Sequence, residues 1–200
     1  MERGLREFAQ PYEQNMIELR DLRPQDSEQL RQWRNSPEVA AYMYTDHEIS
    51  PEEHAAWFAG IEGDPTRKYW IIVYKGEDVG LVNLAGIDMK NRRSYWAFYV
   101  ASPTARGLGV GSFVEWAILG YAFDNLKLNK LCAEVLSTTP TVVALHKRFG
   151  FVEEGRLRQH IIKNGQFVDV VTLGLLASEW EQVKPSLQPT IERVMKHWSR

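Results

Sequence analysis

Three alternating glycines follow an arginine in the middle of the chain, in the run Arg106-Gly107-Leu108-Gly109-Val110-Gly111. The run lies between an aromatic-rich segment that predicts a strand, Ser94 to Val100, and a segment with helical periodicity. Glycines allow successive backbone N–H groups to converge on an anion, and the positive end of the following helix strengthens the attraction. The run therefore predicts a phosphate-binding loop between a strand and a helix.

The spacing of the glycines excludes two familiar phosphate loops. A Walker loop ends in Gly-Lys-Ser/Thr, but the position five residues after Gly107 is Ser112 and no lysine follows it. A Rossmann loop needs a small residue three positions after its second glycine, and the two registers place Ser112 or Val114 there. Neither register fits well. The residues alone leave open a phosphate loop of another kind or a glycine-rich turn.

The segments after the loop have the periodicity of regular structure. Apolar or aromatic residues recur at helical spacing from Val110 to Ala122, so the loop opens a helix. The run from Leu131 to Leu136 predicts a mostly buried strand. Pro140 to Phe149 then predicts a short helix, followed by Gly150-Phe151.

Two parts of this series resemble the signatures of the GNAT superfamily of acetyl-CoA-dependent N-acetyltransferases. Arg106, Gly109 and Gly111 fit its pyrophosphate loop, Arg/Gln-x-x-Gly-x-Gly/Ala, and Ala144 to Phe151 resembles the helix ending that is its second signature. The resemblance, over residues 16–178, implies an α/β fold of mixed α+β type. Its sheet is central, mixed and mostly antiparallel, splayed at the middle strands, with helices on both faces. Residues 1–15 are then an N-terminal extension, and residues 179–200 a C-terminal helical tail.

The remaining elements complete the order β-α-α-β-β-β-α-β-α-β-β, which is that of the resembled fold. The predicted elements are a strand at 16–22, a helix at 25–34, a loop at 36–49, a helix beginning at 50–53, strands at 69–74 and 79–87 with a turn at 75–78, and a hairpin at 164–165. Ser50 as N-cap, Pro51 at the first helical position and Glu53 form a strong helix start.

Composition restricts the class of protein. With 200 residues and 44% hydrophobic content we expect one well-buried domain, and a net charge of −2 gives no electrostatic reason for binding nucleic acid or an anionic membrane. No apolar run is long enough to span a bilayer, and the polar start is no signal peptide. Cys132 is the only cysteine, which excludes an intramolecular disulfide and suits a reducing cytosol. We therefore expect a cytoplasmic protein in which Cys132 is a packing residue.

The resemblance implies that acetyl-CoA is the co-substrate and that no metal takes part. In the resembled fold, the strand before the loop separates from the next one. Its free backbone groups then bind pantetheine and polarise the thioester carbonyl. The implied coenzyme-binding residues are Phe98, Tyr99, Val100, Arg106, Gly107, Leu108, Gly109, Val110, Gly111, Ser112, Thr139 and Lys147.

Two side chains are candidates for proton transfer. Glu134 is a carboxylate in a strand of apolar neighbours, and because a buried carboxylate is costly unless paired or used, we expect it to be the general base, acting through water. A structural ion pair is the alternative. His146 stands where the resembled family usually has a tyrosine that protonates the departing sulfur. Since an imidazolium can donate that proton, His146 either keeps the acid role or only packs under the coenzyme.

The acceptor is read from the first two helices and the loop between them. There Trp33-Arg34-Asn35, the run from Tyr42 to Ser50, and His54 with Trp57 resemble the GNAT branch of pseudaminic acid biosynthesis and flagellin glycosylation. That branch acetylates the 4-amino group of a UDP-linked 4-amino-4,6-dideoxy-N-acetyl-altrosamine. The resemblance thus implies a UDP-amino-sugar acceptor. The implied substrate-binding residues are Arg34, Asn35, Met43, Tyr44, His54, Trp57, Asn83 and Tyr95.

The chemistry of these side chains is compatible with a sugar nucleotide. Met43, Tyr44, Trp57 and Tyr95 offer apolar faces to a deoxysugar, and Arg34 and His54 could meet the diphosphate. Each also has a simpler interpretation, since an Arg or His near a helix end is commonly a solvated surface residue and a Trp at helical spacing is commonly core.

Other functions remain open at this stage. The run from Ile161 to Val171 also resembles GNATs that acetylate the N-terminus of ribosomal proteins and those that acetylate polyamines. Those acceptors are cationic. Acidic and basic residues both occur in the acceptor region, so their charges only weakly distinguish a cationic acceptor from a sugar nucleotide. A non-catalytic acyl-CoA sensor is a different class, against which Glu134 and His146 argue. A homodimer is possible, with the late strands and the tail from Trp180 to Trp198 as interface.

Overall fold

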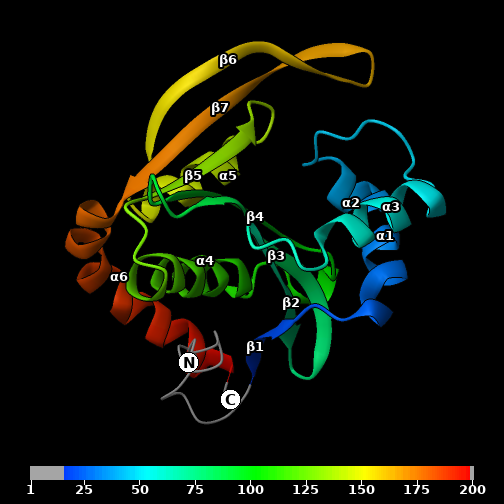
Figure 1. The fold of residues 1–200 in the computed structure, drawn as a ribbon. Helices are drawn as coiled ribbons and strands as arrows, with labels where there is room; N and C mark the ends of the chain where they lie inside the picture. Colours follow the sequence, from blue (N-terminus) through cyan, green and yellow to red (C-terminus); the bar gives the residue numbers. More distant parts are fainter. Residues whose placement is uncertain (1–15, 199–200) are drawn as a thin grey trace.

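The computed structural model describes residues 16–198, and the predicted N-terminal extension, residues 1–15, lies outside the described residues. Seven strands form one sheet in the order β1-β2-β3-β4-β5-β7-β6 (Figure 1). All neighbouring pairs are antiparallel except β4 and β5, which are parallel. The predicted mixed, mostly antiparallel sheet is confirmed. The strands are β1 Ile17–Asp21, β2 Arg67–Tyr74, β3 Glu77–Asp88, β4 Arg93–Val100, β5 Lys130–Leu136, β6 Val152–Lys163 and β7 Gln166–Leu176.

Within residues 16–198, six α-helices connect or cover the strands. They are α1 Ser27–Asn35, α2 Pro37–Ala40, α3 Pro51–Ile61, α4 Val110–Gly120, α5 Pro140–Arg148 and α6 Ala177–Trp198. Short 3₁₀ turns precede α1 and α4, at Pro24–Asp26 and Pro103–Ala105, and a π-turn at Tyr121–Asn125 extends α4. The predicted element order is confirmed. One prediction was wrong in part, because the segment expected as a loop, 36–49, contains helix α2 behind Pro37 at its first position.

Helices cover both faces of the sheet, and β2 shows why. Its alternate side chains Ile71 and Val73 pack with Leu30 of α1 and with Trp57 of α3, whereas Trp70 and Ile72 pack with the cluster that contains α4 and α6. Side chains of a strand alternate between its two faces, and apolar residues on both faces indicate a strand buried on both sides. The predicted placement of helices on both faces is confirmed (Figure 1).

Strands β4 and β5 separate soon after they begin. They pair only at Arg93 with Lys130, Ser94 with Leu131 and Tyr95 with Cys132. Beyond these positions β4 remains paired with β3, and β5 remains paired with β7. The separation was expected from the resemblance, and it leaves the facing edges of 96–100 and 133–136 without a neighbouring strand.

The C-terminal helix α6 belongs to the main core. Trp180 and Trp198 are almost fully buried there, Trp180 against Trp116 of α4 and Trp198 against Phe113 and Tyr74. The rings of these two tryptophans are therefore used within the chain, and an interface formed by the late strands and this tail stays a prediction.

A charged network joins three segments at the start of the sheet. The guanidinium of Arg20 on β1 donates to both carboxylate oxygens of Asp26, at 2.7 and 2.8 Å, and to Asp78 on β3, at 2.6 and 3.1 Å. Burial disfavours the charged form of Asp26, but hydrogen bonds from Arg20 and from the Arg23 amide outweigh it and hold its pKa below the ordinary value. The contribution of Asp26 to stability is fully present above the ordinary carboxyl pKa of the unfolded chain, and it is lost as the pH falls through the lowered pKa of the folded state.

Replacing Arg20 with Met tests this network. The variant leaves Asp26 buried without its cation, so we expect the free energy of unfolding to fall by about 3 to 5 kcal/mol at neutral pH. Urea denaturation followed by circular dichroism measures it. As a control, Arg156→Met removes the exposed pair with Asp169 and should leave the urea midpoint nearly unchanged. Equal effects of the two variants would contradict the assignment.

Candidate active site

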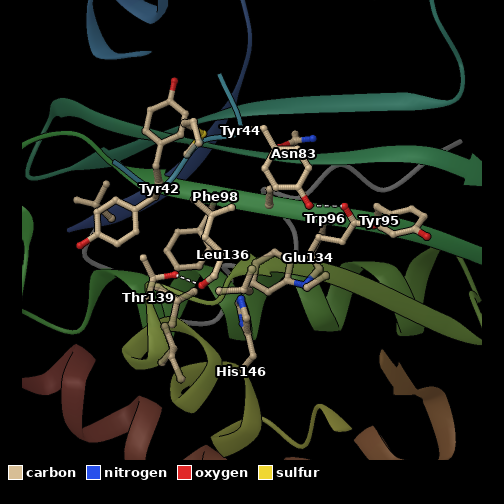
Figure 2. A pocket seen from close by; sticks show the side chains of 18 of the residues that line it. Tyr42, Tyr44, Asn83, Tyr95, Trp96, Phe98, Glu134, Leu136, Thr139 and His146 are labelled. Atoms are coloured by element: carbon tan, nitrogen blue, oxygen red, sulfur yellow. Dashed lines mark hydrogen bonds between the residues drawn. The ribbon is translucent and has the colours of Figure 1, made fainter. Parts of the chain in front are cut away.

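A cavity of about 610 Å³ lies where β4 and β5 separate. Its wall comes from the second halves of both strands, from α5, and from the segment around α2 (Figure 2). The lining includes twelve of the predicted site residues, namely Arg34, Met43, Tyr44, Asn83, Tyr95, Phe98, Tyr99, Val100, Arg106, Glu134, Thr139 and His146. The separation of the two strands thus brings coenzyme, catalytic and acceptor candidates from distant parts of the chain to one cavity.

The predicted phosphate loop leads directly into helix α4. Gly109 is the N-cap at φ +84°, a left-handed conformation that favours glycine, and the first bond within the helix runs from the Phe113 amide to the Gly109 carbonyl. The amides of Val110, Gly111 and Ser112 therefore have no acceptor within α4. They lie at the positive end of the helix dipole, an arrangement that suits a phosphate.

Two contacts hold this loop in place. Nε1 of Trp198, in α6, donates to the carbonyl of Leu108 at 2.7 Å, and Val194 packs against Gly109 so closely that a side chain there would overlap it. Arg106 donates from Nε to the carbonyl of Val100 at 2.9 Å and from Nη2 to that of Ala101 at 3.2 Å. The Val100 carbonyl, expected to be free, is therefore occupied by Arg106.

Glu134 projects from β5 into the cavity and is solvent exposed, so the expectation of a buried carboxylate was wrong. Its Oε2 accepts a 2.7 Å hydrogen bond from the hydroxyl of Tyr44, which reaches across from the segment after α2 (Figure 2). Partial burial of the phenol raises the pKa of Tyr44 well above its ordinary value, and the hydrogen bond to the Glu134 carboxylate adds a smaller effect in the same direction. Tyr44 therefore stays a proton donor to Glu134, which leaves the second carboxylate oxygen available to an acceptor amine or a water.

His146 lies on α5 at the opposite wall and is buried, with its ring against Trp96 and Phe151 at centroid distances of 5.2 and 5.3 Å. Its Nδ1 is 2.8 Å from Oε1 of Glu115, a residue of α4 with no exposed surface. Burial raises the pKa of Glu115 above the ordinary value of a glutamate, against the smaller opposing effect of His146. The arrangement is a buried acid and base pair at the edge of the cavity.

The end of the cavity that the sequence predicts to bind the acceptor is lined by the segment after α2. Arg34 on α1 donates from Nη2 to Thr45 at 3.0 Å, and its buried Nε has no hydrogen-bond partner among residues 16–198. The tip of the β6–β7 hairpin fixes this segment to the end of α2, because Nζ of Lys163 donates to the carbonyls of Ala40, Met43 and Thr45 at 2.8 Å each. Figure 1 shows the hairpin arching over toward this segment.

Four of the predicted side chains point to other places. His54 and Trp57 pack against each other in the aromatic cluster of α3, with ring centroids 5.1 Å apart, and neither lines the cavity. Burial lowers the pKa of His54. Asn35 makes two hydrogen bonds with the backbone of Ile49. Lys147 pairs with Glu153 on the surface. Their predicted roles in binding substrate or coenzyme have no support in this geometry, because the patterns that suggested them describe helix packing and loop closure equally well.

The sequence interpretation missed two residues that shape the site. Glu115 is the only charged residue between Val110 and Phe123, and a lone carboxylate in an apolar helix was a usable signal. Lys163 gave no local signal, since its three carbonyl partners lie more than a hundred residues earlier in the chain. Among the described residues, no group of three or more His, Cys, Asp or Glu side chains is placed to hold a metal ion, and no helix is long and apolar enough to cross a bilayer.

Comparison with known proteins gives a consistent family. The domain model described as "Acetyltransferase (GNAT) domain" matches residues 17–152. A putative ribosomal N-acetyltransferase, YdaF of Bacillus subtilis, is 28% identical over 84% of this chain and 95% of its own length. The acetyltransferase PseH of Campylobacter jejuni is 29% identical over 73% of this chain and 92% of its own length.

A solved structure agrees in fold. The spermidine N-acetyltransferase of Vibrio cholerae, in complex with CoA and spermine, superimposes with a TM-score of 0.77 over 84% of this chain and 99% of the other. Its sequence is 24% identical to this chain, so the likeness concerns the fold.

Substitution of Gly107 tests the predicted phosphate loop. Gly107 has φ +74°, and a side chain at this position would meet no atom within 4 Å, so only the backbone conformation limits the choice of residue. Valine disfavours this conformation by about 1 to 2 kcal/mol, and we expect Gly107→Val to weaken acetyl-CoA binding about tenfold in calorimetry. Gly107→Asn is the matched control, because asparagine tolerates positive φ. Unchanged affinity in both variants would argue against coenzyme binding at this loop.

Replacement of Lys163 tests the fixing of the acceptor segment. Lys163→Met removes three charge-assisted hydrogen bonds, so we expect amide hydrogen exchange in residues 40–46 to become at least about tenfold faster, with the global unfolding midpoint little changed. Ile162→Thr, on the exposed side of the same strand, is the control. If the two variants exchange alike in this segment, Lys163 does not hold it.

Proposed function

The chain belongs to the GNAT acetyltransferase family, and on that premise we propose that it transfers the acetyl group of acetyl-CoA to the 4-amino group of a UDP-linked 4-amino-4,6-dideoxy sugar. Its family and its relatives are acetyltransferases, and it is an acetyl-CoA-dependent N-acetyltransferase. The sugar acceptor rests on the resemblance of residues 33–57 to the pseudaminic acid branch and on the similarity to PseH. The proposed use of the product is flagellin glycosylation.

The observation that carries the acceptor assignment is the position of Arg34. Its guanidinium lines the acceptor end of the cavity and keeps a buried N–H group without a partner among the described residues. A guanidinium with donors to spare fits a diphosphate, whereas it would repel a polyamine. Met43 and Tyr95 lie on the same lining and offer apolar faces to a deoxysugar.

The coenzyme would occupy the other end of the cavity. The free amides at the start of α4 would hold its diphosphate, and the unpaired edge of β4 at Phe98 and Tyr99 would receive the pantetheine and polarise the thioester carbonyl. The side chain of Thr139 already donates to the Leu136 carbonyl, so it would meet the coenzyme as part of the wall.

Transfer then requires one proton to leave the amine and one to reach the sulfur. The neutral amine attacks the thioester carbonyl, the new C–N bond forms as the C–S bond breaks, and the amine proton passes to Glu134, directly or through water. His146 donates a proton to the departing thiolate, and solvent restores it. Tyr44 holds the Glu134 carboxylate in place through its hydrogen bond.

A polyamine or an N-terminal amine is the second candidate acceptor. Glu38 and Glu134 both line the cavity, and carboxylates are what a cationic acceptor needs. The similarity to YdaF and the fold of the spermidine acetyltransferase also favour this candidate. Arg34 on the same lining is the reason to rank the sugar nucleotide first.

A parallel assay of acceptors separates the candidates. Thiol release from acetyl-CoA is measured with the UDP-linked 4-amino-4,6-dideoxy-N-acetyl-altrosamine, with spermidine, and with a peptide that begins with alanine. We expect kcat/KM for the sugar nucleotide to exceed the other two by about 100-fold or more, and Arg34→Met to reduce that advantage about tenfold or more.

Two results would contradict the proposal. Turnover confined to spermidine or to the peptide would end the sugar assignment while leaving the family intact. No turnover with any of the three amines, although acetyl-CoA binds in calorimetry, would favour a sensor without catalytic activity.

A further inference from the structure

We propose that Glu115 is a positioning residue for acetyl transfer. It shares a proton with Nδ1 of His146 and thereby keeps the other proton of the pair on Nε2, the nitrogen that faces the cavity. The inference rests on the proposed acid role of His146. It adds a residue that touches neither substrate, because Glu115 has no exposed surface and lies behind His146 as seen from the cavity.

The geometry of the pair is that of a strong hydrogen bond. Oε1 of Glu115 and Nδ1 of His146 are 2.8 Å apart. The two residues are separated by 31 positions in the sequence and lie on different helices, α4 and α5. Because Nδ1 is engaged by the carboxyl group, Nε2 is the ring nitrogen left for the cavity, which His146 lines. A carboxyl group at Nδ1 fixes both the orientation and the tautomer of an imidazole.

Burial of Glu115 makes this partner necessary. The residues around it on α4 are apolar and buried, among them Val114, Ile118 and Leu119, and its Oε2 has no hydrogen-bond partner among residues 16–198. Burying a lone carboxylate in such surroundings costs free energy, and an apolar side chain of similar size would fill the same space without that cost. The contact with His146 is the feature that distinguishes this position from an ordinary core position.

Counting protons shows what the pair does. With two protons it carries no net charge, whether the proton between Oε1 and Nδ1 resides on the carboxyl group or on the ring, and in both forms the other proton is on Nε2. A neutral pair tolerates burial. When Nε2 gives its proton to the thiolate, the shared proton remains at Nδ1, so the ring stays a neutral imidazole and the negative charge rests on Glu115. Solvent returns one proton and restores the pair.

Few charged groups disturb this balance. The rings that pack on His146 are Trp96 of β4 and Phe151, both uncharged. Beside His146, the charge that acts on Glu115 is Arg148, an exposed residue of α5, which favours the carboxylate weakly.

A double-mutant cycle in the full-length protein tests the proposal, with the amine that the parallel assay selects. We expect Glu115→Gln to lower kcat about 10- to 100-fold, with KM for acetyl-CoA changed less than about twofold. It should also move the high-pH limb of kcat to lower pH by about 1 to 3 units, because the amide cannot compensate the imidazolium charge. Glu115→Asp should restore part of the rate. Glu181→Gln, at an exposed site on α6, is the matched control.

The background of the cycle is His146→Phe. If Glu115 acts through His146, Glu115→Gln changes the kcat of His146→Phe by less than about twofold, since the partner is already gone. A full 10- to 100-fold loss in both backgrounds would overturn the proposal, because Glu115 would then act without His146. An unchanged kcat and pH limb in Glu115→Gln itself would overturn it as well.

A spectroscopic measurement needs no acceptor and separates this inference from the proposed function. In the ¹⁵N-histidine-labelled protein, the ring signals of His146 are those absent from His146→Phe. We expect Glu115→Gln to shift the loss of the Nε2 proton to lower pH by about 1 to 3 units. Identical titrations in wild type and Glu115→Gln would overturn the pair, whatever the acceptor. A shift without turnover of any amine would instead contradict the proposed function alone.

Discussion

The separation of β4 from β5 is the constraint around which the rest of the molecule is arranged. After three paired positions the two strands lose contact, and each is held on its other side, β4 by β3 and β5 by β7. Unpaired backbone inside a protein costs free energy unless another group satisfies it. A sheet that keeps such a gap therefore has room for a ligand with an extended, hydrogen-bonding chain, and the 610 Å³ cavity lies at this point.

Two parts of the candidate site are stabilised by contacts from distant parts of the chain. At the predicted phosphate loop, the last turn of α6 supports Leu108 and Gly109 through Trp198 and Val194. At the proposed acceptor end of the cavity, Lys163 at the tip of the β6–β7 hairpin holds three carbonyls from the end of α2 and the segment after it. Both supports come from the C-terminal part of the chain. An intact C-terminal region is thus needed to shape a site whose recognisable motifs lie earlier.

Local sequence patterns were sufficient for the order of the elements and for much of the site. The glycine run and the helix ending at Gly150-Phe151 are local motifs, so each could be identified from a few consecutive residues. The turn at Asn164 and Gly165 was predicted because both residues adopt positive φ easily. Glu134 and His146 were chosen by their place relative to these motifs, and both line the cavity.

Tertiary contacts account for what the sequence did not reveal. His54 and Trp57 have the composition of a binding site, but helical spacing places them in an aromatic cluster on α3. Glu134 was expected to be buried because its neighbours are apolar, whereas it is the one exposed residue of β5 and lines the cavity beside the separated strands. The partners of Glu115 and Lys163 are set by helix and hairpin packing, which no local pattern encodes.

The most direct test of this account is amide hydrogen exchange of the full-length protein with and without acetyl-CoA. The account predicts that the coenzyme slows exchange at residues 97–100 of β4, which line the cavity, and at residues 110–112, whose amides have no acceptor within α4. Protection confined to other segments, with these two unchanged at saturating acetyl-CoA, would contradict it.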